Sequence, residues 1–139
     1  MNNTGIYTIK KLDDPNNPNV VKVLEDIRRA AEMLKWEQHT SVNESTALLL
    51  AVGGDGTMIH GMKLSAKYGI PVLGFNLGKL GFLAEYAPGA VLETLALAMK
   101  DALRVEYRTI LECDVNGTAQ TAVNDLVFSP KFADKMLKY

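Results

Sequence analysis

A glycine-rich segment, GGDGT at residues 53–57, follows an apolar run at residues 47–52 and precedes a helix-like stretch. Glycines allow backbone N–H groups to turn toward an anion, and the start of a helix adds unpaired donors and a partial positive charge. Asp55 would repel a phosphate, so it suits a magnesium ion or the hydroxyl that attacks the phosphate. The segment is typical of phosphoryl transfer to an alcohol. The alternative is a tight strand-to-helix turn in which Asp55 caps the helix.

A second segment with polar and glycine residues spans residues 76–85, just past an apolar run at residues 71–76 that predicts a strand. In open α/β sheets, ligands bind at the carboxyl ends of the strands. There Asn76 can donate and accept hydrogen bonds, Lys79 can neutralise a phosphate, and Phe82 offers a flat face to a base. The alternative is a glycine-rich surface loop, with Phe82 in the core and Lys79 in solvent.

The third candidate is the pair Asn124 and Asp125, which lies within the apolar run at residues 122–128. An amide beside a carboxylate is costly to bury unless something pairs with it, and the adjacent hydroxyls of a ribose would do so. The alternative is a local turn or bulge. His60 lies one turn into the helix after the glycine segment and is a further candidate, although a lone surface histidine is the simpler interpretation.

Composition narrows the class of partner. The 139 residues are 47% hydrophobic and 22% charged, which is ordinary globular content. The 15 basic and 16 acidic residues nearly cancel, so charge favours neither nucleic acid nor an anionic membrane as a partner, and we expect small molecules. The single cysteine, Cys113, excludes an internal disulfide. Without a signal sequence or an apolar stretch that spans a bilayer, the sequence predicts a cytoplasmic protein.

Strands alternate with helices in residues 1–104, which predicts an α/β fold, a Rossmann-like open sheet with flanking helices. Residues 5–9 have a strand pattern, and Asn19 is expected to cap the following helix. The apolar residues of that helix recur at spacings of three and four. They are Val20, Leu24, Ile27, Ala31 and Leu34.

Two buried parallel strands are predicted at residues 47–52 and 71–76, because neither run alternates with polar residues. A crossover helix at residues 57–67 joins them, and another helix is predicted at residues 88–103. Trp36, His39 and Cys113 are interpreted as structural or incidental, since no base near Cys113 in sequence would activate it.

The pattern changes beyond Arg104 to strands alone, at residues 105–115 and 119–128, joined by a hairpin turn at Asn116 and Gly117. We therefore expect a second, β-rich unit at residues 105–139. A few strands with open edges rarely stand alone. The unit is accordingly expected to be incomplete, and either the chain is truncated or a partner supplies the missing edge.

Several segments together resemble the NAD kinase family: residues 53–57, PVLGFNLGKLGFL at 71–83, RTILE at 108–112, and Asn124 with Asp125, in the family's order and with similar spacing. The first segment is also found in lipid kinases and, in variant form, in phosphofructokinases, whereas the second and the last point to NAD kinases. Family members are longer, and their β domain carries a further segment rich in glycine and threonine. The resemblance thus implies a chain that stops within the β domain.

The resemblance implies transfer of the γ-phosphoryl group of ATP, or of polyphosphate, to the 2′-hydroxyl of the adenosine ribose of NAD, with Mg²⁺ or another divalent metal. It implies that Asp55 orients or deprotonates that hydroxyl and that the protein is a homo-oligomer. No residue is directly assigned as a metal ligand. The residues assigned to NAD binding are Gly56, Phe82, Asn124 and Asp125, and those assigned to the phosphate loop are Gly53, Gly54 and Thr57. Asn76, Lys79 and His60 are additional candidates.

Two other functions remain open from the sequence. A lipid or sugar kinase would share the glycine-aspartate segment and phosphorylate a headgroup or a sugar instead of NAD. A catalytically inactive remnant or regulatory subunit would bind the nucleotide without turnover and join full-length kinase subunits through its unfinished sheet edge.

Overall fold

The computed structural model describes residues 5–10, 14, 16–78, 81–84, 86–123 and 125–127. Contacts between Cα atoms divide the chain into two compact units, Met1–Glu106 and Tyr107–Tyr139. Each unit has its own β-sheet. Across the described ranges, no helix is both long enough and apolar enough to cross a lipid bilayer.

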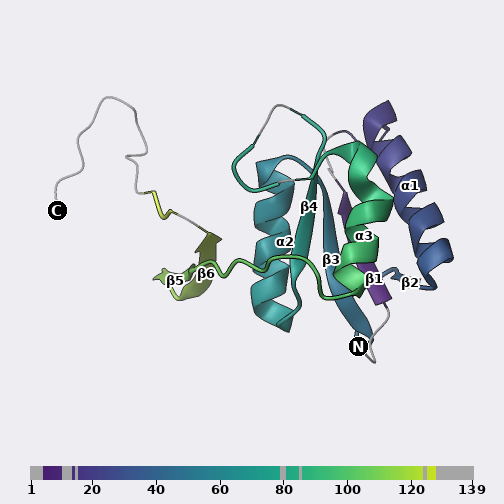
Figure 1. The fold of residues 1–139 in the computed structure, drawn as a ribbon. Coiled ribbons are helices and arrows are strands. Elements are labelled where there is room, and N and C mark those ends of the chain that lie inside the picture. The colour runs from purple at the N-terminus through teal and green to yellow at the C-terminus, as the bar shows by residue number, and fades with distance from the viewer. Residues whose placement is uncertain are drawn as a thin grey trace. The chain divides into compact units, whose positions relative to one another are not determined.

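The sheet of the first unit has four parallel strands in the order β2-β1-β3-β4 (Figure 1). They are β1 (Gly5–Lys10), β2 (Glu37–His39), β3 (Thr46–Gly53) and β4 (Val72–Asn76). Strand β2 is absent from the sequence-based expectation. Because it has only 3 residues at the edge of the sheet, two of them exposed, it leaves no hydrophobic pattern to detect.

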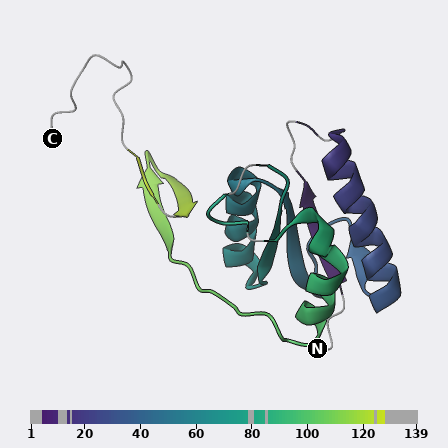
Figure 2. The ribbon, with the colours of Figure 1, turned by 45° about the horizontal axis from the view of Figure 1, so that its top comes forward.

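Helices cover both faces of this sheet. Helices α1 (Pro18–Leu34) and α3 (Val91–Met99) lie together on one face, and α2 (Asp55–Tyr68) lies on the opposite face, as the two views in Figures 1 and 2 show. The chain therefore leaves β1 on one side of the sheet and β3 on the other. Neighbouring strands whose connections diverge in this way mark a topological switch point, where a crevice opens at the strands' carboxyl ends. The α/β prediction is confirmed.

Strand β3 explains why the run at residues 47–52 shows no alternation. Leu48, Leu50 and Val52 pack in the core shared with α1 and α3, whereas Ala51 packs in the core beneath α2. A strand buried on both faces needs apolar residues at every position. The larger core consists of Ile6, Val23, Ile27, Ala30, Ala31, Trp36, Leu48, Leu50, Val52, Leu73, Phe75, Val91 and Leu95.

Two helix boundaries differ from those predicted. Helix α1 is capped by Asn17, not Asn19: the Asn17 side chain accepts the N–H of Asn19, and Pro18 occupies the first turn, where its missing N–H costs nothing. The helix predicted at residues 88–103 begins as the 3₁₀ turn η1 (Pro88–Ala90), and α3 ends at Met99. It ends there because Asp101 adopts a left-handed φ of 52°, which stops helical propagation.

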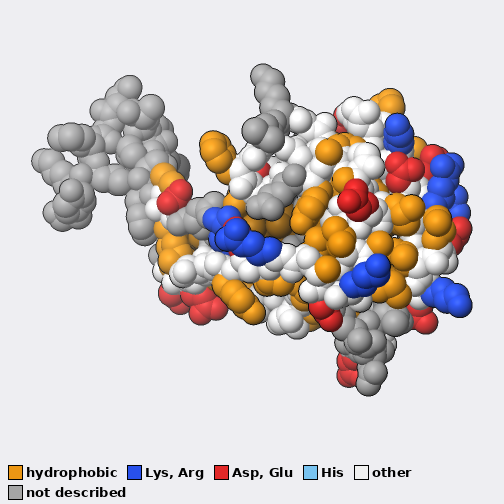
Figure 3. Space-filling model, in the orientation of Figure 1, with side chains coloured by type: hydrophobic (Ala, Val, Ile, Leu, Met, Phe, Trp, Pro, Cys, Tyr) orange, Lys and Arg blue, Asp and Glu red, His pale blue; other side chains and the backbone are white. Residues whose placement is uncertain are grey.

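Helix α3 buries only part of its apolar residues. Val91 and Leu95 are buried, but Leu92 and Met99 are exposed. Figure 3 shows hydrophobic side chains gathered over α3 and the adjoining part of α1 on this face of the first unit. Helix α3 therefore packs against the larger core mainly through Val91 and Leu95.

The second unit contains an antiparallel hairpin of β5 (Ile110–Val115) and β6 (Thr118–Val123). Its turn is the predicted one: Asn116 and Gly117 have φ of 54° and 80°, as a type I′ turn requires. Both strands are shorter than predicted. The pairing ends at Ile110 and Val123. The described residues before Ile110 and after Val123 therefore have no residue opposite them in the hairpin and are not part of its strands.

Candidate functional site

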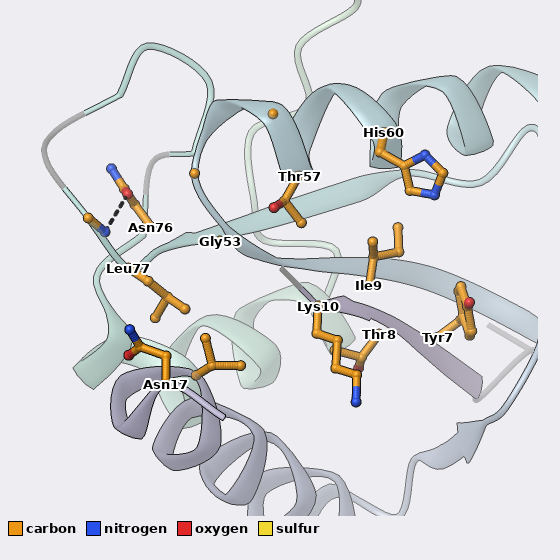
Figure 4. A pocket seen from close by; sticks show the side chains of 14 residues that line it. Tyr7, Thr8, Ile9, Lys10, Asn17, Gly53, Thr57, His60, Asn76 and Leu77 are labelled. Carbon is orange, nitrogen blue, oxygen red and sulfur yellow. Dashed lines mark hydrogen bonds between the residues drawn. The ribbon is translucent and has the colours of Figure 1, made fainter. Parts of the chain in front are cut away.

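A cavity of about 740 Å³ opens at the carboxyl ends of β1, β3 and β4, at the switch point between β1 and β3 (Figure 4). The starts of α1 and α2 complete its wall. The lining residues are Tyr7, Thr8, Ile9, Lys10, Asn17, Val20, Gly53, Gly54, Gly56, Thr57, His60, Asn76, Leu77 and Gly78. Both glycine-containing segments singled out from the sequence thus meet at one cavity.

The cavity has the electrostatic character of an anion site. Lys10 is a cation in its wall, and neither Asp nor Glu occurs among the described residues that line it. Two helices begin there, α1 at its cap Asn17 and α2 at its cap Gly54, and no side chain caps α2. The uncapped N–H groups and the partial positive charge of a helix start favour a phosphate.

The glycines of the segment at residues 53–57 have different surroundings. A Cβ on Gly53 would lie 2.8 Å from Thr57 Cβ, so packing requires glycine there. A Cβ on Gly54 or Gly56 would meet no atom within 4 Å, and neither residue has a left-handed φ. Protein packing and backbone conformation therefore leave both positions open to a side chain, although both border the cavity.

Asp55 does not line the cavity. Its carboxylate accepts the N–H of Phe82 at Oδ2 (3.2 Å) and the N–H of Leu83 at Oδ1 (3.1 Å). The alternative in which Asp55 caps its own helix is wrong, because Gly54 is the N-cap and no side chain bonds to that helix end. The glycines of this segment therefore border the cavity, whereas the Asp55 carboxylate is hydrogen-bonded to the loop that follows β4.

That loop leaves β4 at Asn76 and returns at Tyr86. The Asn76 N–H donates to the Tyr86 oxygen (2.9 Å), and the Tyr86 N–H donates to the Gly74 oxygen (3.3 Å), which closes the loop at its base. The Asn76 side chain accepts the N–H of Gly78 (3.0 Å), as Figure 4 shows. Phe82 is 94% exposed, so the alternative that places it in the core is wrong. Among the described residues of the loop, Leu83 and Ala84 are buried.

The remaining candidates divide into three groups. His60 is exposed and lines the cavity together with Asn76. Asp125 belongs to the second unit, where it is exposed and donates its N–H to the Val123 oxygen (3.1 Å). Since β6 ends at Val123, the prediction of an apolar strand around Asp125 is wrong for the described residues, and the local turn is observed. Asn124 and Lys79 lie outside the described residues.

Sequence reasoning missed the contribution of β1 to the site. Tyr7, Thr8 and Lys10 line the cavity, as does Asn17 at the start of α1. The signal was available, because the rule that ligands bind at strand ends applies to β1 as well as to β3 and β4. The structural interpretation of Trp36 and His39 is confirmed: Trp36 packs in the larger core, and His39 Nδ1 lies 2.8 Å from Thr46 Oγ1.

The side chains that commonly bind metals are scattered over the described residues. No group of three or more His, Cys, Asp or Glu side chains gathers among the described residues. Both oxygens of Asp55 also accept backbone N–H groups. The described residues therefore offer donors suited to phosphate and to hydroxyl groups, and they gather no cluster of three or more protein ligands for a metal.

Relatives of this chain are NAD kinases, and the chain spans about half the length of those it matches. It is 35% identical to NAD kinase of Moorella thermoacetica over 97% of this chain and 44% of the relative. It is 34% identical to NAD kinase of Shewanella oneidensis over 98% of this chain and 54% of the relative.

Solved structures show the same fold. Yeast NADH kinase complexed with NADH superposes with a TM-score of 0.62 at 23% identity, over 86% of this chain and 46% of that chain. An NAD kinase from Archaeoglobus fulgidus in complex with ATP gives a TM-score of 0.60 at 19% identity, over 83% and 45%. The family model of the ATP-NAD kinase N-terminal domain matches residues 8–103, which include β3, the glycine segment, Asp55 and the loop that carries Phe82. This chain belongs to the NAD kinase family.

Proposed function

We propose that this chain acts in an NAD kinase, which transfers the γ-phosphoryl group of ATP to the 2′-hydroxyl of the adenosine ribose of NAD and so forms NADP. The observation that carries the proposal is the pair of open glycines on either side of Asp55. Gly54 and Gly56 have room for a side chain, yet each leaves bare backbone at the wall of the cavity. Bare backbone lets phosphate oxygens approach N–H groups closely.

The donor and the acceptor would occupy different sides of the glycine segment. The phosphates of ATP, or of polyphosphate, would bind in the cavity with Lys10 and the start of α2, because these are its cationic and N–H groups. The ribose of NAD would lie near Asp55, with the adenine against the exposed face of Phe82. Each Asp55 oxygen uses one lone pair for a backbone N–H and retains another for the 2′-hydroxyl.

Phosphoryl transfer in this arrangement relies on aligning the 2′-hydroxyl with the γ-phosphate and on neutralising the negative charge of the phosphates. The divalent metal would enter with ATP, bound chiefly by the phosphates, because Mg²⁺ usually binds through substrate phosphates and few protein ligands. Asn76, His60 and Thr57 line the same cavity and are the further candidates for contact with the donor.

Residues 1–104 would form the nucleotide-binding domain, and residues 105–139 the start of the β-rich domain that brings Asn124 and Asp125 to NAD. The homo-oligomer and the cytoplasmic location expected from the sequence stay predictions.

The first test is NADP formation from NAD, ATP and Mg²⁺ by the 139-residue chain, with Asp55→Asn alongside. We expect turnover that falls on the order of 100-fold or more in the variant, while the fold is kept. Absence of turnover in the unmodified chain would reject a self-sufficient kinase. In that case, binding of NAD without turnover would favour the regulatory or remnant function.

Gly56→Ala tests the site without depending on turnover. Alanine inside a helix is favoured over glycine by roughly 0.5–1 kcal/mol, so the variant should unfold at the same or higher urea concentration. Gly56 was assigned to NAD from the resemblance, but it lines the cavity that we propose for the donor phosphates, so the new methyl group should lower the affinity for ATP. Gly89→Ala is the matched control, since Gly89 is equally open but lies away from the cavity. Equal ATP affinity in both variants would argue against the cavity as the donor site.

A further inference from the structure

The loop that carries Phe82 is hydrogen-bonded to the glycine segment, which is distant in sequence. The Asp55 carboxylate accepts the N–H groups of two successive loop residues, Phe82 and Leu83, one at each oxygen. The two partners are 27 and 28 positions away in sequence, so each bond joins separate segments. Hydrogen bonds to an ionised acceptor are about twice as strong as neutral ones. The carboxylate therefore restrains the backbone on which the Phe82 ring stands.

Gly81 provides the space in which this contact forms. A Cβ on Gly81 would lie 2.9 Å from Asp55 Cγ and 3.1 Å from Asp55 Oδ2. The first distance is shorter than real Cβ contacts and the second is unusually tight, so a side chain at this position would displace the carboxylate. The close approach of the Asp55 carboxylate is therefore a reason in itself for glycine at this position.

The residues after Phe82 anchor the other end of the restrained segment. Leu83 and Ala84 are buried, and Leu83 packs with Ala51 and Met58 beneath α2. Phe82, in contrast, projects almost entirely into solvent. A large aromatic ring that is exposed among the described residues, on backbone restrained by two hydrogen bonds, is pre-organised for a ligand, because less conformational freedom is left to lose on binding.

The geometry points to Asp55 and Gly81 as positioning residues for Phe82. We name this contact the Asp55 clasp: the Asp55 carboxylate bonded to the N–H groups of Phe82 and Leu83, with Gly81 beside it. The clasp sets where the ring meets the acceptor's base and so controls affinity for the acceptor, separately from any action of Asp55 on the hydroxyl. This inference rests on the proposed function, since it takes the acceptor to be a nucleotide whose base contacts Phe82.

Amide hydrogen exchange tests whether the clasp exists, and it needs no ligand. In the unmodified chain, the amides of Phe82 and Leu83 should be protected. In Gly81→Ala both should exchange faster by roughly tenfold to a hundredfold, which corresponds to loss of a hydrogen bond to a charged group. Asp55→Asn adds no volume and keeps one acceptor oxygen, so only one of the two amides should be released. Gly89→Ala should change neither, because its Cβ meets nothing.

Ligand affinity then tests the positioning role. Gly81→Ala should bind NAD about tenfold more weakly than Gly89→Ala does, while the two variants bind ATP equally, because Gly81 does not line the cavity. General damage to the fold would weaken both ligands, and the fluorescence of the single, buried Trp36 reports such damage independently.

The outcomes separate this inference from the proposed function. Equal amide exchange in Gly81→Ala and Gly89→Ala would overturn the clasp. Faster exchange with unchanged NAD affinity would overturn the positioning role. If the unmodified chain bound no NAD, the proposed function and the positioning role would both fall, while the exchange rates would still decide whether the clasp holds the loop.

Discussion

Gly74 of β4 lies directly against Met58 in the first turns of α2. A Cβ on Gly74 would come within 2.8 Å of Met58 Sδ and 3.1 Å of both Ala84 Cα and Ala84 Cβ. The strand, the helix that begins at Asp55 and the loop held by the Asp55 clasp therefore meet at one glycine. The geometry of the site therefore depends on how β4 packs against α2 and against this loop, as well as on the motifs.

Gly74→Ala should destabilise the first unit by about 1–3 kcal/mol, because overpacking a filled site forces side chains or backbone to move. Urea unfolding followed by Trp36 fluorescence measures this, since Trp36 is the only tryptophan and is buried in the first unit's core. Gly89→Ala serves as the control. An unchanged midpoint for Gly74→Ala would show that Met58 and Ala84 yield without cost.

Lys10→Ala should weaken ATP binding several-fold to about tenfold, because Lys10 is a cation in the cavity wall and charge-assisted contacts to phosphate are strong. The loss should shrink at high salt, as expected for a screened interaction. Calorimetric titration at two salt concentrations measures both effects. Lys22→Ala removes the same charge from an exposed position on α1 that does not line the cavity, so it should bind ATP normally. Equal losses in the two variants would mean that only overall charge matters.

Thr46→Val should cost about 1–3 kcal/mol although it conserves volume. The Thr46 hydroxyl is buried, accepts the Asn43 N–H (3.0 Å) and lies 2.8 Å from His39 Nδ1. Valine leaves both partners unsatisfied at the start of β3. Thr46→Ser retains the hydroxyl and should lose much less, as judged by Trp36 fluorescence during urea unfolding. Similar losses in the two variants would point to the methyl group as the stabilising part.

Gly69→Ala should destabilise the first unit by about 1 kcal/mol, because Gly69 ends α2 with a left-handed φ of 68°, which alanine adopts only with strain. A Cβ there would meet no atom, so sterics with neighbours play no part. Gly69→Asn should lose less, since asparagine tolerates this conformation better. Thermal unfolding of the three proteins measures the order, and an equal melting temperature for Gly69→Ala would contradict it.

Much of the first unit could be predicted because its signals are local. The apolar run at residues 47–52, the glycine segment and the spacing of Val20, Ile27 and Ala31 each define an element from a few neighbouring residues. The turn at Asn116 and Gly117 was predictable for the same reason, since a type I′ turn needs those residue types. The lengths of β5 and β6 were not, because a strand ends where its partner ends and not where its own apolar pattern ends.

The sequence by itself determined the family, the α/β class and the candidate residues of the glycine segment and of the following loop, because all of these are encoded in short stretches of chain. Only the tertiary structure decided that Lys10 faces the cavity with Gly54 and Gly56, and that the Asp55 carboxylate bonds to Phe82 and Leu83 instead of capping its helix. The physical reason is distance along the chain. Contacts between β1, β3 and a loop after β4 exist only once parallel strands lie side by side, and no local pattern records which strand ends will meet.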